Sequence, residues 1–343
     1  MIVIPQTPLV IDDPSQHTMG GSLLKYVETR THEFVDELKY QSIRVIGLYD
    51  RKVSASRKEK RDKPENWQRP TARLISGELQ ICCFPGKAYV FHYASLIATY
   101  LALTNRDPTI VKLALPSDKE SKVAISQSNY SILEPTDVLV VGSGISHLTS
   151  PINFRDYDTF QAKQELLSKH SVTWLMVKHS FWGDIAYWIG AELASRGFPL
   201  IIFVGKLGSL NPQHVPNETL ATGNQSTIGG EDLVWDNLFA TTKVHEVANG
   251  SHITLPSVLQ ETLDWRSSNS LKYTFVDPEI GNMSSGVLSN DSHFSYLHIV
   301  SDNLSRQFSE DLSNERSGKI PQKRVGMYRK ISSVLHEQLK NLA

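Results

Sequence analysis

The sequence predicts an α/β protein with a mostly parallel or mixed central sheet that is covered by helices on both faces. The first observation is a set of short apolar runs, rich in β-branched and aromatic residues, at 137–144, 172–179, 199–205 and 296–302. The second is a helical pattern at 184–197, between two of these runs. Buried strands that alternate with helices are typical of a parallel sheet covered on both sides.

Composition and charge limit the function classes. The chain has 343 residues, enough for one large domain or two smaller ones, and its 40% hydrophobic and 21% charged residues are ordinary for a globular protein. The net charge of −1 provides no electrostatic footprint for nucleic acid or an anionic membrane. We therefore expect a small-molecule substrate, and neither a nucleic-acid nor a membrane partner.

The cysteines and the N-terminus favour a reducing compartment. Cys82 and Cys83 are adjacent and are the only two cysteines, so no disulfide framework can form. The first residues lack the basic region of a signal peptide. No apolar run approaches the roughly 18 residues that a membrane span needs. We expect a cytoplasmic protein.

Residues 1–135 form a divergent N-terminal region that we expect to pack partly on the core. A charged run at 50–70 predicts a solvated loop, with a phosphate-binding basic patch as the alternative. An apolar run at 79–84 predicts a strand, and 91–104 reads as a helix.

Residues 136–310 contain the predicted core. The helix at 184–197 places apolar residues at helical spacing and ends at Gly197. The other expected elements are strands at 217–224 and 272–277 and helices at 256–266 and 279–289. Residues 311–343 are expected to form a C-terminal amphipathic helix.

Generic motifs of nucleotide, acyl-transfer and metal chemistry are absent. The sequence has no Walker A loop, and GSGIS (142–146) fits neither the dinucleotide fingerprint nor the nucleophile elbow. The histidines form no metal-binding pattern, and we interpret His298 as a satisfied core residue. We expect no metal and no cofactor.

The residues that follow the strands are the candidates for chemistry, because ligands bind at the carboxyl ends of the strands in such sheets. The strand at 199–205 leads into Gly205, Lys206 and Gly208, where backbone N–H groups could approach an anion or a sugar. The alternative is a simple turn.

Two further strands end in carboxylates. Asp277 and Glu279 follow the strand at 272–277, and Ser301 and Asp302 follow the strand that begins at Tyr296. Each carboxylate also has a structural interpretation, as a favourable charge at a helix N-terminus or as a helix cap.

The order of these segments resembles the nucleoside phosphorylase and nucleosidase superfamily, which includes purine nucleoside phosphorylases and methylthioadenosine/adenosylhomocysteine nucleosidases. The resemblance covers roughly residues 170–305 and implies a phosphorylase/hydrolase-like fold. The segments that carry it are LMVKHSFWGDIAYWIGAEL (175–193), IIFVGKLGSL (201–210), ATGNQS (221–226), VDPE (276–279) and HIVSD (298–302).

The resemblance implies cleavage of an N-glycosidic bond, by water or phosphate, through an oxocarbenium-like transition state in which the leaving base is protonated. Asp302 is similar in position to the acid for the base, and Glu279 to the glutamate that binds the ribose hydroxyls. The loop around Gly205 would face phosphate or water. Asp277 and Ser301 would line the substrate pocket. The resemblance also implies that the protein assembles as a homo-oligomer.

Several positions depart from the family pattern. Ser226 stands where the family has an aromatic residue that stacks on the base, with Trp235 and Phe181 as weak substitutes. Phe203 takes the place of an arginine, which slightly favours hydrolysis over phosphorolysis. Lys206 takes the place of a small hydroxyl residue, and it could partly substitute for the arginine or serve a substrate phosphate or carboxylate.

Other readings stay open because of these departures. Pro278 replaces the methionine of the family's sugar pocket, while Arg44 could restore a phosphate site from the N-terminal half. A non-nucleoside substrate on the same scaffold, or a non-catalytic protein that binds a nucleoside-like ligand, therefore remain alternatives.

Overall fold

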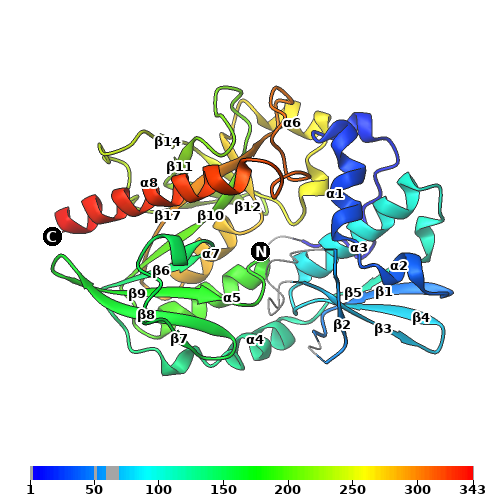
Figure 1. Cartoon of the computed structure of the whole chain (residues 1–343), viewed down its shortest axis with the longest axis horizontal. Helices are drawn as coiled ribbons and strands as arrows, with labels where there is room; N and C mark the ends of the chain where they lie inside the picture. The colour runs from blue at the N-terminus through cyan, green and yellow to red at the C-terminus, as the bar shows by residue number, and fades with distance from the viewer. Residues whose placement is uncertain (1–2, 50–51, 59–68, 343) are drawn as a thin grey trace.

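The computed structural model describes residues 3–49, 52–58 and 69–342. Two sheets lie side by side, a smaller one from the N-terminal region and a larger one from the rest of the chain (Figure 1). The predicted loop at 50–70 lies largely outside the described residues, so its solvation stays a prediction.

The smaller sheet has the strand order β2-β3-β4-β1-β5. Strand β1 pairs in parallel with β4 and β5, and β3 is antiparallel to its neighbours. The predicted strand at 79–84 and helix at 91–104 are confirmed as β4 and α3. The elements of this region are α1 (Leu23–Arg30), α2 (Phe34–Glu37), β1 (Ser42–Ile46), β2 (Ser54–Ala55), β3 (Thr71–Ile75), β4 (Glu78–Cys82), α3 (Lys87–Leu103), β5 (Val111–Ala114) and α4 (Asp118–Ser126).

The larger sheet has 12 strands within the described residues. They are β6 (Val138–Gly142), β7 (Arg155–Asp156), β8 (Phe160–Leu167), β9 (His170–Val177), β10 (Leu200–Ser209), β11 (Leu220–Thr222), β12 (Gln225–Ile228), β13 (Glu231–Val234), β14 (Val247–Asn249), β15 (His252–Thr254), β16 (Phe275–Asp277) and β17 (His293–Asn303). The middle of the sheet, β9-β6-β10-β17, is parallel. Strand β8 is antiparallel to β9, and β16 is antiparallel to β10 but parallel to β15. The predicted mixed sheet is confirmed.

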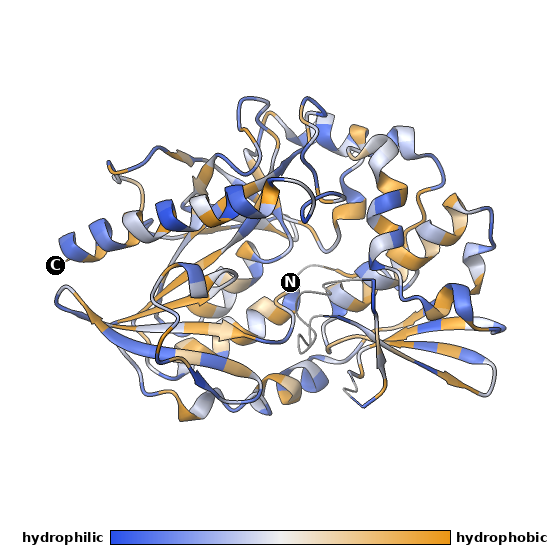
Figure 2. Ribbon diagram, viewed as in Figure 1, coloured by the Kyte–Doolittle hydropathy of each residue, from blue (hydrophilic) through white to orange (hydrophobic). Residues whose placement is uncertain are grey.

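Helices cover both faces of this sheet. Side chains of a strand alternate between the two faces, so neighbouring residues of β10 contact helices on opposite sides. In β10, Ile201 and Phe203 join the cluster that includes α5 (Asp184–Ser195) and α7 (Ile280–Leu288). Ile202 and Val204 join the opposite cluster, which contains the apolar side of α8 (Ile320–Asn341). Figure 2 shows the hydrophobic central strands and the mixed colouring of α8 that an amphipathic helix gives.

Some predicted boundaries were wrong. The expected helix at 256–266 is broken into a 3-10 turn, η6 (Val258–Gln260), and α6 (Leu263–Asn269). The break arises because Thr262 caps α6, accepting a hydrogen bond from the backbone N–H of Trp265. The strand expected at 217–224 shortens to β11. The other 3-10 turns are η1 (Pro14–Gln16), η2 (Gly20–Ser22), η3 (Pro108–Ile110), η4 (Tyr130–Ile132) and η5 (Ile145–His147).

Within the described ranges, the helices are too short or too polar to cross a membrane.

Candidate functional site

A cavity of about 830 Å³ lies at the carboxyl ends of β6, β10 and β17. Helices α1 and α3 of the N-terminal region contribute to its lining, and so do α8 and the connector that precedes α8. Most of the residues that the sequence singled out line it: Gly205, Lys206, Gly208, Asp277, Glu279, Ser301 and Asp302. The cavity is thus built from segments of both halves of the chain.

Ser226 does not line this cavity, and its assignment as a substrate-binding residue is corrected. It lies in β12, fully buried, with its hydroxyl 2.8 Å from His252 Nδ1 and 3.2 Å from Thr254 Oγ1. The hydroxyl also lies against Gly281, so these neighbours enclose the side chain. Strands β15 and β16 lie between β12 and β10.

Asp302 lies inside β17 and is not a helix cap, because the strand continues to Asn303. It is only 8% exposed, and the Ser301 hydroxyl donates a hydrogen bond of 2.8 Å to its Oδ1. Burial raises the pKa of the Asp302 carboxyl to about 6, although the hydrogen bond from Ser301 opposes this shift. Asp302 can therefore hold a proton much closer to neutrality than an ordinary aspartate can.

Asp277 caps the start of α7. Its Oδ1 accepts hydrogen bonds from the backbone N–H groups of Glu279 at 2.9 Å and Ile280 at 2.8 Å, as the structural interpretation expects. Two buried histidines flank the same carboxylate, with His252 Nε2 at 3.0 Å from Oδ1 and His298 Nε2 at 3.9 Å from Oδ2. These contacts fix Asp277 and place Glu279 directly before the first turn of α7.

His298 is buried as predicted, but the hydrogen-bonding groups of its ring are not satisfied. Neither of its ring nitrogens has a hydrogen-bond partner of good geometry among the described residues. Burial lowers the pKa of His298 to about 4, so the ring is neutral at physiological pH. The imidazole lies against Gly205 on the neighbouring strand, where an added Cβ would come within 2.6 Å of Nε2.

Glu261 is a cavity residue that the sequence reasoning missed. It is 3% exposed, and burial raises the pKa of its carboxyl well above the usual value, with the charges of Asp302 and Asp277 adding to the shift. The N-terminal segment holds its backbone, because Thr18 N–H donates to the Glu261 carbonyl at 3.1 Å. No sequence signal marked it, since it fell in a stretch expected to be a plain helix.

The cavity also has a cationic part. Lys206 Nζ lies 2.5 Å from Glu315 Oε2, Arg324 Nη1 lies 3.0 Å from the same oxygen, and Arg30 Nη2 lies 3.1 Å from Oε1. Arg44, the arginine suggested from the sequence, instead pairs with Glu78 at 3.0 Å in the small sheet and lies outside the cavity. Arg30 and Arg324 could not be found from the sequence, because nothing local relates α1 or α8 to β10.

Aromatic side chains line the part formed by α3 and the loop before α5. Phe181, one of the two aromatic residues suggested from the sequence, lines the cavity, whereas Trp235 does not. Next to Phe181, Trp182 stacks on His92 of α3, with ring centroids 4.0 Å apart and planes at 21°. The Trp182 Nε1–H also donates to the Pro256 carbonyl at 2.9 Å, which fixes the indole.

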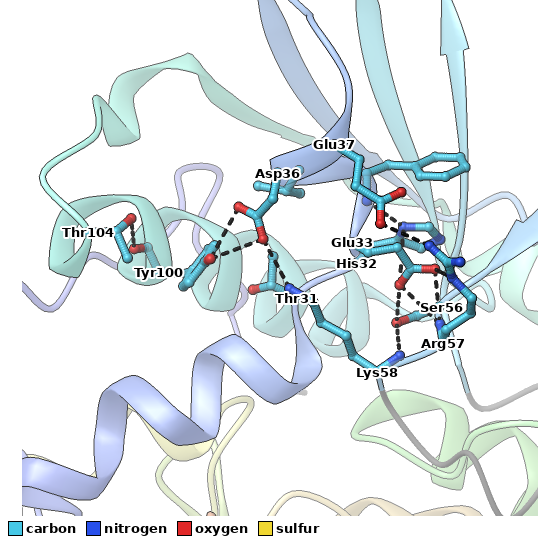
Figure 3. Close-up of polar contacts among 12 residues, drawn as sticks. Thr31, His32, Glu33, Asp36, Glu37, Ser56, Arg57, Lys58, Tyr100 and Thr104 are labelled. Carbon is cyan, nitrogen blue, oxygen red and sulfur yellow. Dashed lines mark hydrogen bonds and ion pairs between the residues drawn. The ribbon is translucent and has the colours of Figure 1, made fainter.

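Lys58 brings the N-terminal region to the cavity wall. Its ammonium lies 3.0 Å from Asp36 Oδ2, and the Tyr100 hydroxyl donates to the same carboxylate at 3.1 Å. Figure 3 shows these contacts beside the bonds between Arg57 and the Glu33 carboxylate. The cluster anchors the chain segment that enters the cavity wall to α2.

The described part of the chain contains no group of three or more His, Cys, Asp or Glu side chains arranged to hold a metal ion.

No protein-family model matches the sequence, and no curated protein is detectably similar to it. Three solved structures illustrate what the chain is similar to. The 5′-methylthioadenosine/S-adenosyl homocysteine nucleosidase of Campylobacter jejuni is 10% identical with a TM-score of 0.47, over 61% of this chain and 100% of that one. The purine nucleoside phosphorylase of Toxoplasma gondii, in complex with immucillin-H, is 15% identical with a TM-score of 0.47, over 60% and 93%. A futalosine hydrolase mutant of Helicobacter pylori is 9% identical with a TM-score of 0.45, over 60% and 99%.

Proposed function

We propose that this protein cleaves the N-glycosidic bond of a purine nucleoside or a nucleoside-like substrate. The observation that carries the proposal is that Asp302 and Glu279 line one cavity, with the pKa of Asp302 raised to about 6. A carboxyl group that keeps its proton near neutral pH can donate it to the base as the bond to the sugar breaks.

Glu279 is proposed to hold the sugar. An ionised carboxylate has enough lone pairs to accept hydrogen bonds from two adjacent hydroxyls. Glu279 is the residue directly before α7, where the helix dipole favours a negative charge. A carboxylate kept ionised beside the sugar would also stabilise the positive charge that develops on the ring in the transition state.

Glu261 and the aromatic side chains of Phe181, Trp182 and His92, here called the aromatic wall, are proposed to hold the base. The Glu261 carboxyl, if it keeps its proton, presents one O–H donor beside one carbonyl acceptor. This pair fits the edge of a base that offers one acceptor beside one donor. Trp182 and Phe181 offer faces on which a base could stack, worth about 1–3 kcal/mol. These residues supply the stacking surface that Ser226 cannot.

The acceptor of the sugar is proposed to be phosphate, with water as the alternative. The sequence slightly favoured water because Phe203 stands in place of an arginine. However, Lys206, Arg30 and Arg324 all line the cavity, and phosphate binding needs such cations. This observation supports inorganic phosphate as a co-substrate.

The test is release of free base from a panel of nucleosides and nucleotides, with and without phosphate. The wild type is compared with Asp302→Asn and with Asp264→Asn, an exposed carboxylate at the start of α6 that serves as the matched control. Loss of the acid is expected to slow release by about 10²–10⁴-fold.

The outcomes separate the candidate functions. Release that needs phosphate and is lost only in Asp302→Asn supports phosphorolysis, and release without phosphate supports hydrolysis. Release that survives in Asp302→Asn contradicts the role of Asp302. No release from any nucleoside contradicts the proposal and leaves a non-nucleoside substrate or a ligand-binding role.

A further inference from the structure

Residues 304–319, the connector between β17 and α8, place one carboxylate among three cations of the cavity. Glu315 lies 2.5 Å from Lys206, 3.0 Å from Arg324 and 3.1 Å from Arg30. These three cations come from β10, α8 and α1, which are far apart in the sequence. Three separate elements therefore converge on one negatively charged group.

In the ion pairs of this cluster, cations outnumber carboxylates, because Lys206, Arg30 and Arg324 all pair with Glu315. The Glu315 and Arg324 side chains are only 15% and 12% exposed, so water does little to offset that excess. In addition, Arg324 Nη2 is buried without a hydrogen-bond partner among the described residues. The cluster can accept more negative charge than Glu315 supplies.

The connector does not depend on Glu315 alone for its position. Glu310 accepts hydrogen bonds from Asn217 Nδ2 at 2.8 Å and Lys323 Nζ at 2.6 Å, outside the cavity lining. Arg306 donates to the carbonyl of Ser15 at 2.8 Å. These contacts would hold the first part of the connector, which precedes Glu315, if the Glu315 side chain withdrew from the cavity.

We propose that Glu315 is an internal competitor for an anion site, and that the connector must withdraw this carboxylate before a phosphate dianion can bind Lys206, Arg30 and Arg324. A phosphate group brings up to two charges and three acceptor oxygens, whereas a carboxylate brings one charge and two oxygens. With Glu315 withdrawn, a phosphate dianion would bring more negative charge to the three cations than the carboxylate supplies, and its additional oxygen could accept a hydrogen bond from Arg324 Nη2. Although burial alone would raise the pKa of Glu315, the three cations hold it well below the usual value, so Glu315 competes as an anion.

This inference deepens the proposed function, because the anion would be either free phosphate or a phosphate carried by the substrate. The binding itself does not depend on turnover. Titration calorimetry with inorganic phosphate, and separately with a nucleoside 5′-monophosphate, distinguishes the two sources. A failure of base release would leave these binding results intact, and the reverse also holds.

The variant is Glu315→Gln, which keeps the side-chain shape and removes the charge, with Glu310→Gln as the matched control in the same connector. Phosphate is expected to bind Glu315→Gln about tenfold more tightly than the wild type, and Glu310→Gln within about twofold of it. Equal affinity in the wild type and Glu315→Gln for both probes would overturn the proposal.

A second measurement uses the wild type, in case Glu315→Gln does not fold. Hydrogen exchange of the backbone amides of 311–317 is followed with and without saturating phosphate. The proposal expects faster exchange when phosphate displaces Glu315. Unchanged or slower exchange would overturn it without any variant.

Discussion

Gly208 and Asp302 are paired across the parallel strands β10 and β17, just past a register shift. A Cβ added at Gly208 would lie 3.3 Å from Asp302 Oδ2 and 2.9 Å from Leu304 Cδ1. The absence of a side chain at Gly208 therefore sets the room in which the Asp302 carboxyl can move. Backbone packing and the chemistry of the proposed acid are coupled at this pair.

We expect Gly208→Ala to displace the Asp302 carboxyl. The methyl of Leu304 can shift at little cost, but Asp302 would have to give way by a few tenths of an ångström. Misplacement of a proton donor is expected to reduce base release about ten- to hundredfold, with a stability loss of about 1–2 kcal/mol. Gly21→Ala, where the added Cβ meets nothing within 4 Å, is the control. Full activity in Gly208→Ala would argue against this coupling.

Base release by the wild type is expected to fall as the pH rises through about 6. The reason is that Asp302, with a pKa raised to about 6, must hold its proton to donate it. The pH profile of Asp302→Asn should lack this limb. An identical limb in the variant would assign the titration to another group.

The same pKa shift predicts how stability depends on pH. Because the folded-state pKa of Asp302 lies above the ordinary value of 3.8 for an aspartate, the folded protein binds more protons than the unfolded chain between these two pH values. The free energy of unfolding should therefore fall as the pH rises from about 4 to about 6, by about 3 kcal/mol for this group. Urea unfolding at several pH values should show this decrease reduced in Asp302→Asn relative to the wild type.

Gly205→Ala is expected to destabilise the fold through His298. The added Cβ would lie 2.6 Å from Nε2 and 3.1 Å from Cδ2 of the buried His298 ring, so either strand β10 or the imidazole ring must move. We expect a loss of about 1–3 kcal/mol in the free energy of unfolding.

A double-mutant cycle tests the cause of that loss. His298→Ala removes the ring, so Gly205→Ala should cost less in the His298→Ala background, with a coupling of about 1 kcal/mol or more. Strictly additive effects in urea unfolding would show that the loss at Gly205 arises elsewhere.

Asp184 is expected to hold the aromatic wall in place. This residue at the start of α5 caps α3, accepting hydrogen bonds from the backbone N–H groups of Lys87 and Ala88, both at 2.9 Å. Asp184→Ala should cost about 1–2 kcal/mol of stability and raise the KM of the substrate, because α3 carries His92 into the cavity.

Asp118→Ala provides the matched control for Asp184→Ala. Asp118 pairs with the Lys87 side chain at 2.6 Å, but this ion pair lies on the surface. Its loss should change stability by less than about 1 kcal/mol and leave the KM unchanged. A thermal-unfolding comparison in which both variants lose the same stability would contradict the capping role.

Local patterns in the sequence were sufficient for the centre of the fold. Continuous apolar runs identified β6, β9, β10 and β17, because strands buried on both faces need apolar side chains at every position. The short edge strands and β8 escaped prediction, since their burial is incomplete and their sequences resemble loops. The carboxyl-end rule for parallel strands placed Asp302 beside the end of β10. Glu279 follows β16, which is antiparallel to β10, so only the family resemblance pointed to its place in the same cavity.

What the sequence by itself determined was the order of buried strands and helices, and with it the part of the sheet where Gly205 and Asp302 line the cavity. Only the tertiary structure decided which other residues join them. Arg30 and Glu315 are 285 residues apart and meet because α1 and the connector pack on the same cavity. Ser226 has a polar side chain after a strand, yet packing turns it into the core. Local sequence specifies backbone conformation and the buried face, whereas such long-range contacts depend on how the finished elements pack.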